Sequence, residues 1–160
     1  NWRLFMAKQK PRIVANNDLK RTDLEQLIGY NLKRAYIVVK DDFREAMGKD
    51  GLSARVFSAL SLTIDHANIT QSELARMMGI ERSGLVAIVD ELEVKGCLSR
   101  VQVPTDRRVQ ALIPTKAGRE LYSETIEAVR AHEDSLFSDL TEAEIKQLLC
   151  LLKKIRHRGE

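Results

Sequence analysis

Residues 70–118 read TQSELARMMG (70–79), IERSGLVAIVDELEVKG (80–96), CLSRVQVPTDRRVQALIP (97–114) and TKAG (115–118). Thr70 and Glu73 have the spacing of a capping box, in which a hydroxyl and a carboxylate each satisfy a backbone N–H at the start of a helix. Gly79 stands where this helix must end, since glycine adopts the left-handed conformation at little steric cost. The apolar stripe of the helix is predicted to consist of Leu74, Met77 and Met78.

A second helix is predicted up to Gly96, because apolar residues recur there at intervals of three and four. Its buried face would consist of Leu85, Ile88, Val89 and Leu92. Its opposite face would carry Arg82, Ser83, Val86, Ala87 and Asp90, with Gly84 beside them near the start.

Two short runs after this helix, 97–103 and 109–113, alternate between apolar and polar residues as strands do. The polar stretch 104–108 between them predicts a turn. Helix, turn, helix and β-hairpin together are the plan of a winged helix-turn-helix. In that fold one helix enters the major groove of DNA, and the hairpin lies against the DNA backbone or the minor groove.

Four segments are similar to a known family in order and spacing: ITQSELA (69–75), ERSGLVAIVDELEVKG (81–96), PTDRR (104–108) and LIPTKAG (112–118). They resemble the MarR family of bacterial transcriptional regulators, and the similarity extends over roughly Leu24 to His157. The resemblance implies a mainly α fold with a small antiparallel wing, and a homodimer that binds a pseudo-palindromic operator in double-stranded DNA. It also implies repression relieved by a small aromatic or phenolic effector.

Helices are expected on both sides of this unit. Residues 24–47 form a long apolar-striped helix that would have difficulty burying its stripe within one subunit, which predicts a dimer. A helix is expected over 53–65, joined to the core by an extended link at 66–69 that pairs with the wing. Another runs from Thr115 to about Phe137, and Thr141 with Glu144 opens the last helix as a second capping box.

The predicted domains follow from these elements. Residues 1–23 form a flexible basic arm, 24–50 and 115–160 form a helical dimerisation region, and 53–114 form the DNA-binding domain. Met6 is a plausible native start, which would make residues 1–5 a foreign remnant.

The first turn of the second helix carries the expected base contacts. Arg82 and Ser83 can reach base edges and phosphates, and Arg pairs bidentately with guanine. Gly84 lets the backbone approach DNA closely. Val86 and Ala87 depart from the family pattern, in which many relatives carry polar or basic residues there, so they are expected to pack against thymine methyl groups while DNA shape supplies further specificity.

Further contacts are expected from the first helix start and the wing. Thr70 and Gln71 can donate to phosphates. The resemblance implies that Arg107 or Arg108 enters the minor groove while Asp106 holds the other arginine. The net charge is only +3, and residues 70–108 carry as many acidic as basic residues. The prediction of DNA binding therefore depends on where four arginines lie: Arg82, Arg100, Arg107 and Arg108.

The resemblance also implies an effector cavity between the first, second and fifth helices. Its expected aromatic and imidazole wall consists of Tyr36, Phe57 and His66, with Asn31 or Arg34 as polar anchors for a phenolic acid.

Two other functions remain open at this point. One is a thiol- or metal-responsive stress sensor on the same fold, although Cys97 and Cys150 look like small core residues and the three histidines lack metal-ligand spacing, so no metal site or cofactor is expected. The other is a protein–protein adaptor that does not bind DNA. An enzyme is not expected, because nucleophile motifs, Gly-rich phosphate loops and paired carboxylates are absent. Cysteine usage and the lack of a signal peptide or membrane-length apolar run favour a reducing cytoplasmic location.

Overall fold

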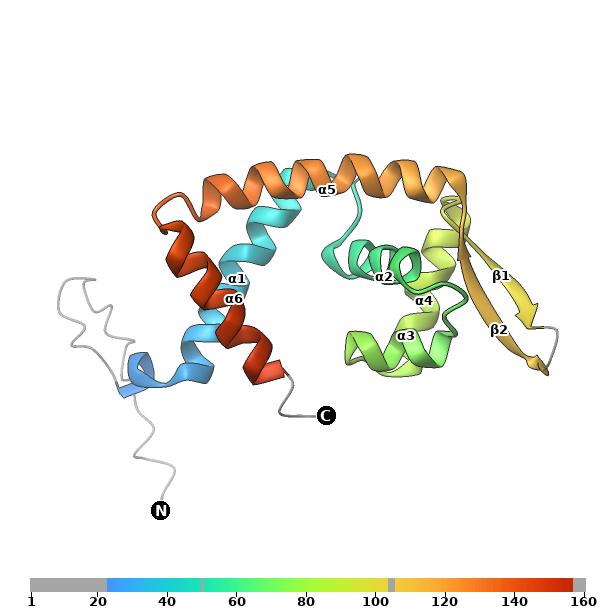
Figure 1. The fold of residues 1–160 in the computed structure, drawn as a ribbon, viewed down its shortest axis with the longest axis horizontal. Helices are drawn as coiled ribbons and strands as arrows, with labels where there is room; N and C mark the ends of the chain where they lie inside the picture. The colour runs from blue at the N-terminus through green and yellow to red at the C-terminus, as the bar shows by residue number, and fades with distance from the viewer. Residues whose placement is uncertain (1–22, 50, 104–105, 157–160) are drawn as a thin grey trace, which may run out of the picture. The chain divides into compact units, whose positions relative to one another are not determined.

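The computed structural model describes residues 23–49, 51–103 and 106–156, which divide into two compact units between Val38 and Val39. The first unit holds a 3-10 helix, η2 (Asp23–Gln26), and the start of α1 (Ile28–Met47). The second holds the end of α1 and the remaining elements, which are α2 (Ala54–Asp65), α3 (Gln71–Met78), α4 (Arg82–Val94), β1 (Leu98–Val103), β2 (Asp106–Pro114), α5 (Lys116–Leu136) and α6 (Glu142–Arg156) (Figure 1). This confirms the predicted class, mainly α with a small antiparallel hairpin.

The first predicted helix is interrupted near its start. A continuous helix from Leu24 was expected, but η2 ends at Gln26 and α1 begins at Ile28. At this break the Asn31 Nδ2 donates to the carbonyl oxygens of Glu25 at 2.7 Å and Leu27 at 2.9 Å. An asparagine that satisfies backbone carbonyls in this way offers the chain an alternative to the regular helical ladder.

The hydrophobic core lies among α2, α3, α4 and the hairpin. All four residues predicted to face inward from α4 are buried, as is Leu74 on α3. The α3 stripe is corrected in one position, since Met77 is exposed and Ala75 is buried instead. Phe57 of α2 lies between Phe43 of α1 and Tyr122 of α5, with ring centroids 5.9 and 5.7 Å away.

The wing is an antiparallel pair whose register runs from Leu98↔Pro114 to Gln102↔Gln110. The predicted turn at 104–108 is too long, because β2 already begins at Asp106. A register shift next to Val103, which pairs with Asp106, lets the strand extend further towards the tip. The predicted pairing of the link after α2 is confirmed, since Thr70 forms a bridge with Ala111 and the Leu112 N–H donates to the Ile69 carbonyl at 2.8 Å.

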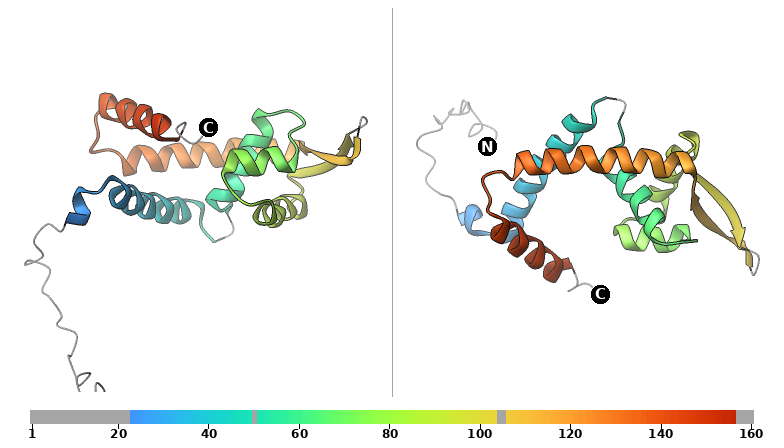
Figure 2. Two further views of the ribbon diagram at one scale, coloured as in Figure 1. Left: turned by 90° about the horizontal axis from the view of Figure 1, so that it is seen from below. Right: turned by 45° about the horizontal axis from the view of Figure 1, so that its top comes forward.

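In the second unit the hairpin and α6 lie at opposite ends of α5 (Figure 2). The α5 start is capped by Thr115 and the α6 start by the Thr141–Glu144 box, as predicted. Neither α1 nor α6 contains a buried residue. Among the described residues, none of the helices is both long enough and apolar enough to cross a membrane.

Candidate nucleic-acid interface

The start of α3 is held by a complete capping box. The Thr70 N–H donates to Glu73 Oε2 at 2.9 Å, and the Glu73 N–H donates to the Thr70 hydroxyl oxygen at 3.3 Å. The backbone N–H of Thr70, followed by its hydroxyl, lowers the pKa of the Glu73 carboxyl. The position of Thr70 and Gln71 is therefore fixed before any ligand binds.

The exposed face of α4 carries every residue predicted there. Arg82, Ser83, Gly84, Val86 and Ala87 are all exposed, while Leu85 between them is fully buried. A Cβ added at Gly84 would meet no atom of the described residues within 4 Å, so the space around this position does not require glycine there. The side chain of the N-cap residue, Glu81, does not cap the first N–H groups of α4.

A cavity of about 370 Å³ joins three elements at this surface. Its lining comes from the α3 start, the first residue of α4 and strand β2, and consists of Thr70, Gln71, Ser72, Glu73, Arg82, Val109 and Gln110. It brings three of the predicted residues, Thr70, Gln71 and Arg82, to one place. Sequence reasoning did not single out Val109 or Gln110; the pairing of residue 70 with residue 111 is the structural link that brings β2 here.

The predicted residues at the wing tip belong to the backbone of β2. Strand β2 includes Asp106, Arg107 and Arg108, but the side chains of these residues lie outside the described part of the chain. The expected ion pair from Asp106 and the expected minor-groove arginine therefore stay predictions.

Arg100 of β1, which the sequence placed among the cations facing DNA, is engaged within the chain. Its backbone N–H donates to Glu93 Oε1 at 3.1 Å, Nη1 pairs with Glu93 Oε2, and Nη2 pairs with Asp90 Oδ1. Both carboxylates belong to α4. The arginine thus ties the wing to the C-terminal half of that helix.

The C-terminal end of α4 is joined closely to the start of α5. The Thr115 hydroxyl donates to the Gly96 carbonyl at 2.7 Å and accepts from the Gly118 N–H at 3.0 Å, while the Thr115 N–H donates to the Cys97 carbonyl at 3.0 Å. A Cβ at Gly118 would lie 2.1 Å from the Cys97 carbonyl oxygen. Only glycine allows this approach, which is the physical reason for a glycine three residues after Thr115 in the Thr-Lys-Ala-Gly segment.

The cysteine prediction is half correct. Cys97 is buried, and burial raises the pKa of its thiol. Cys150 on α6 is exposed in this chain, so it is not a core residue of the single subunit. Sequence periodicity placed Cys150 on the last helix but could not show that none of the residues of this helix is buried in the described part of the chain. Within the described residues, no three His, Cys, Asp or Glu side chains are arranged to hold a metal ion.

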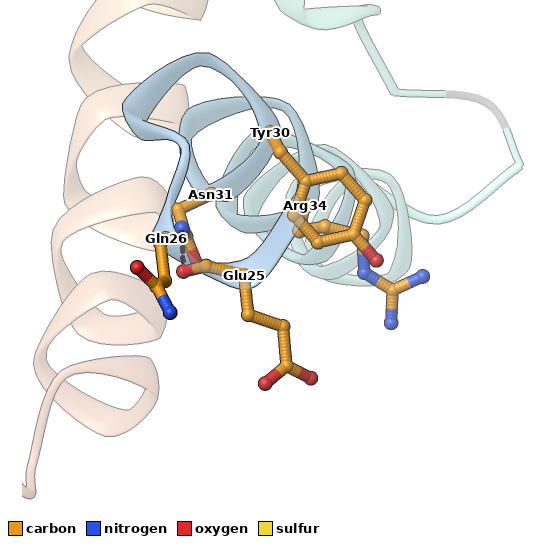
Figure 3. A pocket seen from close by; sticks show the side chains of 5 residues that line it. All are labelled: Glu25, Gln26, Tyr30, Asn31 and Arg34. Carbon is orange, nitrogen blue, oxygen red and sulfur yellow. Dashed lines mark hydrogen bonds between the residues drawn. The ribbon is translucent and has the colours of Figure 1, made fainter. Parts of the chain in front are cut away.

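Two of the proposed effector residues lie together in the first unit. Asn31 and Arg34 line a cavity of about 640 Å³ with Glu25, Gln26 and Tyr30, and Figure 3 shows the bond from Asn31 to the Glu25 carbonyl. Tyr36 is exposed on α1. In the second unit Phe57 belongs to the aromatic stack, while His66 is exposed at the C-cap of α2.

Comparison with known proteins identifies the family. A family model described as MarR family matches residues 50–109. A putative transcriptional regulatory protein for the hcr operon of Thauera aromatica is 30% identical over 145 residues, covering 88% of this chain and 87% of that protein.

Solved structures agree over a similar length. The transcriptional repressor CouR bound to a 23-mer DNA duplex is 35% identical with a TM-score of 0.82, covering 87% of this chain and 99% of that chain. CouR from Rhodococcus jostii RHA1 bound to p-coumaroyl-CoA is 30% identical with a TM-score of 0.74, covering 85% of this chain and 95% of that chain. The chain described here belongs to the MarR family of transcriptional regulators.

Proposed function

We propose that two copies of this chain form a homodimer that binds a pseudo-palindromic operator in double-stranded DNA and represses transcription until a small phenolic ligand releases it. The observation that carries the DNA-binding part is the exposed face of α4 beside the cavity shared with α3 and β2. The 35% identity to a repressor bound to a DNA duplex supports it.

The proposed contacts follow the order of the elements along this surface. Arg82 and Ser83 reach base edges and phosphates, and the open position at Gly84 lets the helix backbone come close. Val86 and Ala87 pack against thymine methyl groups. At the start of α3 the proposed phosphate donor is Gln71, because the N–H and the hydroxyl of Thr70 both donate already to Glu73 Oε2, at 2.9 and 2.7 Å. At the wing, the proposed minor-groove contacts are Arg107 and Arg108, with Asp106 as the orienting carboxylate.

The dimer is proposed from the apolar residues that α1 and α6 leave exposed. Leu148, Leu149 and Leu152 recur on one side of α6 and are all exposed in the single chain. A second copy would cover them, so residues 24–50 and 115–160 are assigned to dimerisation and 53–114 to DNA binding. Two recognition helices would then lie about one helical turn of DNA apart, roughly 34–36 Å.

The effector class is proposed from the relatives and from the first unit. CouR of Rhodococcus jostii RHA1 is bound to p-coumaroyl-CoA, a phenolic thioester, and is 30% identical to this chain. Asn31 and Arg34 offer a polar anchor beside a cavity of the first unit. For release, the effector must have a higher affinity for the conformation that cannot bind DNA than for the conformation that can.

The test begins with purified chain and fragmented genomic DNA. We expect recovery of duplexes that contain an inverted repeat, with an affinity that falls steeply as salt rises. Adding p-coumaroyl-CoA should weaken this affinity. An absence of salt-dependent binding to any duplex would refute the proposal in favour of an adaptor.

The wing is tested on a recovered duplex with Arg107→Ala combined with Arg108→Ala. Loss of two phosphate or groove contacts should remove most of the affinity and lower the salt slope by roughly 2. The control is Lys146→Ala, since Lys146 pairs with Glu142 on α6 at 3.7 Å, away from the proposed interface. Unchanged binding by the double variant would remove the wing from the interface.

A further inference from the structure

Arg100 stands between two carboxylates of the helix that is proposed to read DNA. Its Nη1 pairs with Glu93 and its Nη2 with Asp90, while its backbone N–H donates to Glu93. The Arg100 side chain is 21% exposed, and its Nε is buried with no hydrogen-bond partner in the part of the chain described. The guanidinium is thus already occupied on its carboxylate side and closed to an outside ligand at Nε.

Asp90 lies on the DNA-reading face of α4. It follows Val86 by four residues and Ala87 by three, and residues at these spacings are neighbours on a helix surface. Its side chain is 54% exposed. A free carboxylate at this position would face the phosphate backbone and oppose binding, because like charges repel most strongly where water is displaced.

We infer that Arg100 is a positioning residue that pairs with Asp90 and Glu93 and offsets one of their two negative charges, so that α4 can enter the groove, and that Arg100 does not itself contact DNA. This inference rests on the DNA-binding function proposed above. It separates Arg100 from Arg82, Arg107 and Arg108, whose proposed role is direct contact.

The two roles give different results when the carboxylates are removed as well. If Arg100 touched phosphate, its loss would weaken binding whatever occupied positions 90 and 93, and the salt slope would fall by about 1. If Arg100 offsets the charge of the carboxylates, its loss is harmful only while they are charged. A double-mutant comparison isolates this dependence.

The experiment measures the dissociation constant of four variants for a duplex recovered with the wild-type chain. Arg100→Gln should weaken binding about tenfold. Asp90→Asn with Glu93→Gln should bind no more weakly than wild type. The triple variant should return to within about twofold of that carboxylate variant. Arg44→Gln is the matched control, since Arg44 pairs with Asp41 on α1 at 3.3 Å and carries the same charge.

Arg100→Lys guards against a simple loss of folding, because lysine keeps the charge without the bidentate geometry. It should retain most of the affinity that Arg100→Gln loses. A triple variant as weak as Arg100→Gln, or Arg100→Lys as weak as Arg100→Gln, would overturn the inference. Wild-type binding by Arg100→Gln would overturn it while leaving the proposed function intact, and a wild-type chain that binds no duplex would overturn both.

Discussion

Apolar residues are buried in the region from α2 to the hairpin but stay exposed on helices α1 and α6. Helices α2, α3 and α4 contribute ten buried residues, four, two and four respectively, and their core continues into Leu98 and Leu112 of the hairpin. Helices α1 and α6 are as amphipathic in sequence but bury none. The first region completes its core within one chain, whereas among the described residues the second leaves its apolar surface exposed.

The largest expected effect is the loss of the dimer when the exposed apolar residues of α6 are replaced. Leu149→Asp combined with Leu152→Asp places four charges in a two-fold interface, since every substitution occurs twice. Each leucine contributes about 1.5–3 kcal/mol when fully buried, so the dimer should be lost at micromolar concentration. Sedimentation equilibrium measures the mass.

Lys146→Gln with Lys153→Gln is the control for this pair, because it changes the charge of α6 by the same two units without touching the apolar stripe. A double leucine variant that stays dimeric would show that α6 is not the covering surface.

The next effect concerns the self-sufficient core. Leu92→Ala should lower the free energy of unfolding by about 2–5 kcal/mol, because Leu92 is fully buried and a cavity remains after truncation. Val94→Ala on the same helix is the control, since Val94 is 90% exposed and its loss should stay within roughly 0.5 kcal/mol. Urea denaturation at one fixed chain concentration measures both. Equal effects would contradict the assignment of the core.

A smaller effect is expected at the junction between α4 and α5. Gly118→Ala should cost about 1–3 kcal/mol, because the new methyl group meets the Cys97 carbonyl and the backbone must shift. Gly84→Ala is the contrasting variant: its methyl group meets no atom in the part of the chain that the structure describes, and it should gain up to about 1 kcal/mol of helix stability. Thermal unfolding measures the two changes, and an opposite order would show that the close approach is not maintained in solution.

The smallest effect is a pH dependence at the start of α6. The Thr141 backbone N–H, with its hydroxyl, holds the pKa of Glu144 below its ordinary value of 4.5. A lowered folded pKa means that the capping contribution is complete above about pH 4.5 and is lost as the pH falls through the folded value. Glu144→Gln should therefore lower the melting temperature at about pH 7 more than at about pH 3.

Local sequence patterns were enough for much of the core. The Thr70–Glu73 and Thr141–Glu144 boxes, the end of α3 at Gly79 and the buried face of α4 each depend on residues within a turn or two of one another. Their outcome is determined by hydrogen bonds and periodicity that any surrounding fold would leave in place.

Several features that depend on distant segments were missed, although the pairing of the link after α2 with the wing was predicted. Met77 and Ala75 exchange roles because α3 meets α2 and α4 on a face that periodicity alone does not select. Arg100 reaches α4 only after β1 has folded back along that helix. At the candidate site, Gln110 enters because β2 pairs with the residue before α3. Such contacts require the strand register, which composition and spacing leave open.

The junction at Thr115 and Gly118 has a mechanical consequence. The carbonyl oxygens of Gly96 and Cys97, which follow α4, both accept hydrogen bonds from Thr115, and a Cβ at Gly118 would have no space. The end of α4 and the start of α5 are therefore joined rigidly and do not form a hinge. Helix α5 has 21 residues and is roughly 30 Å long, so it acts as a lever arm. A change in the direction of α5 should therefore move α4 with it.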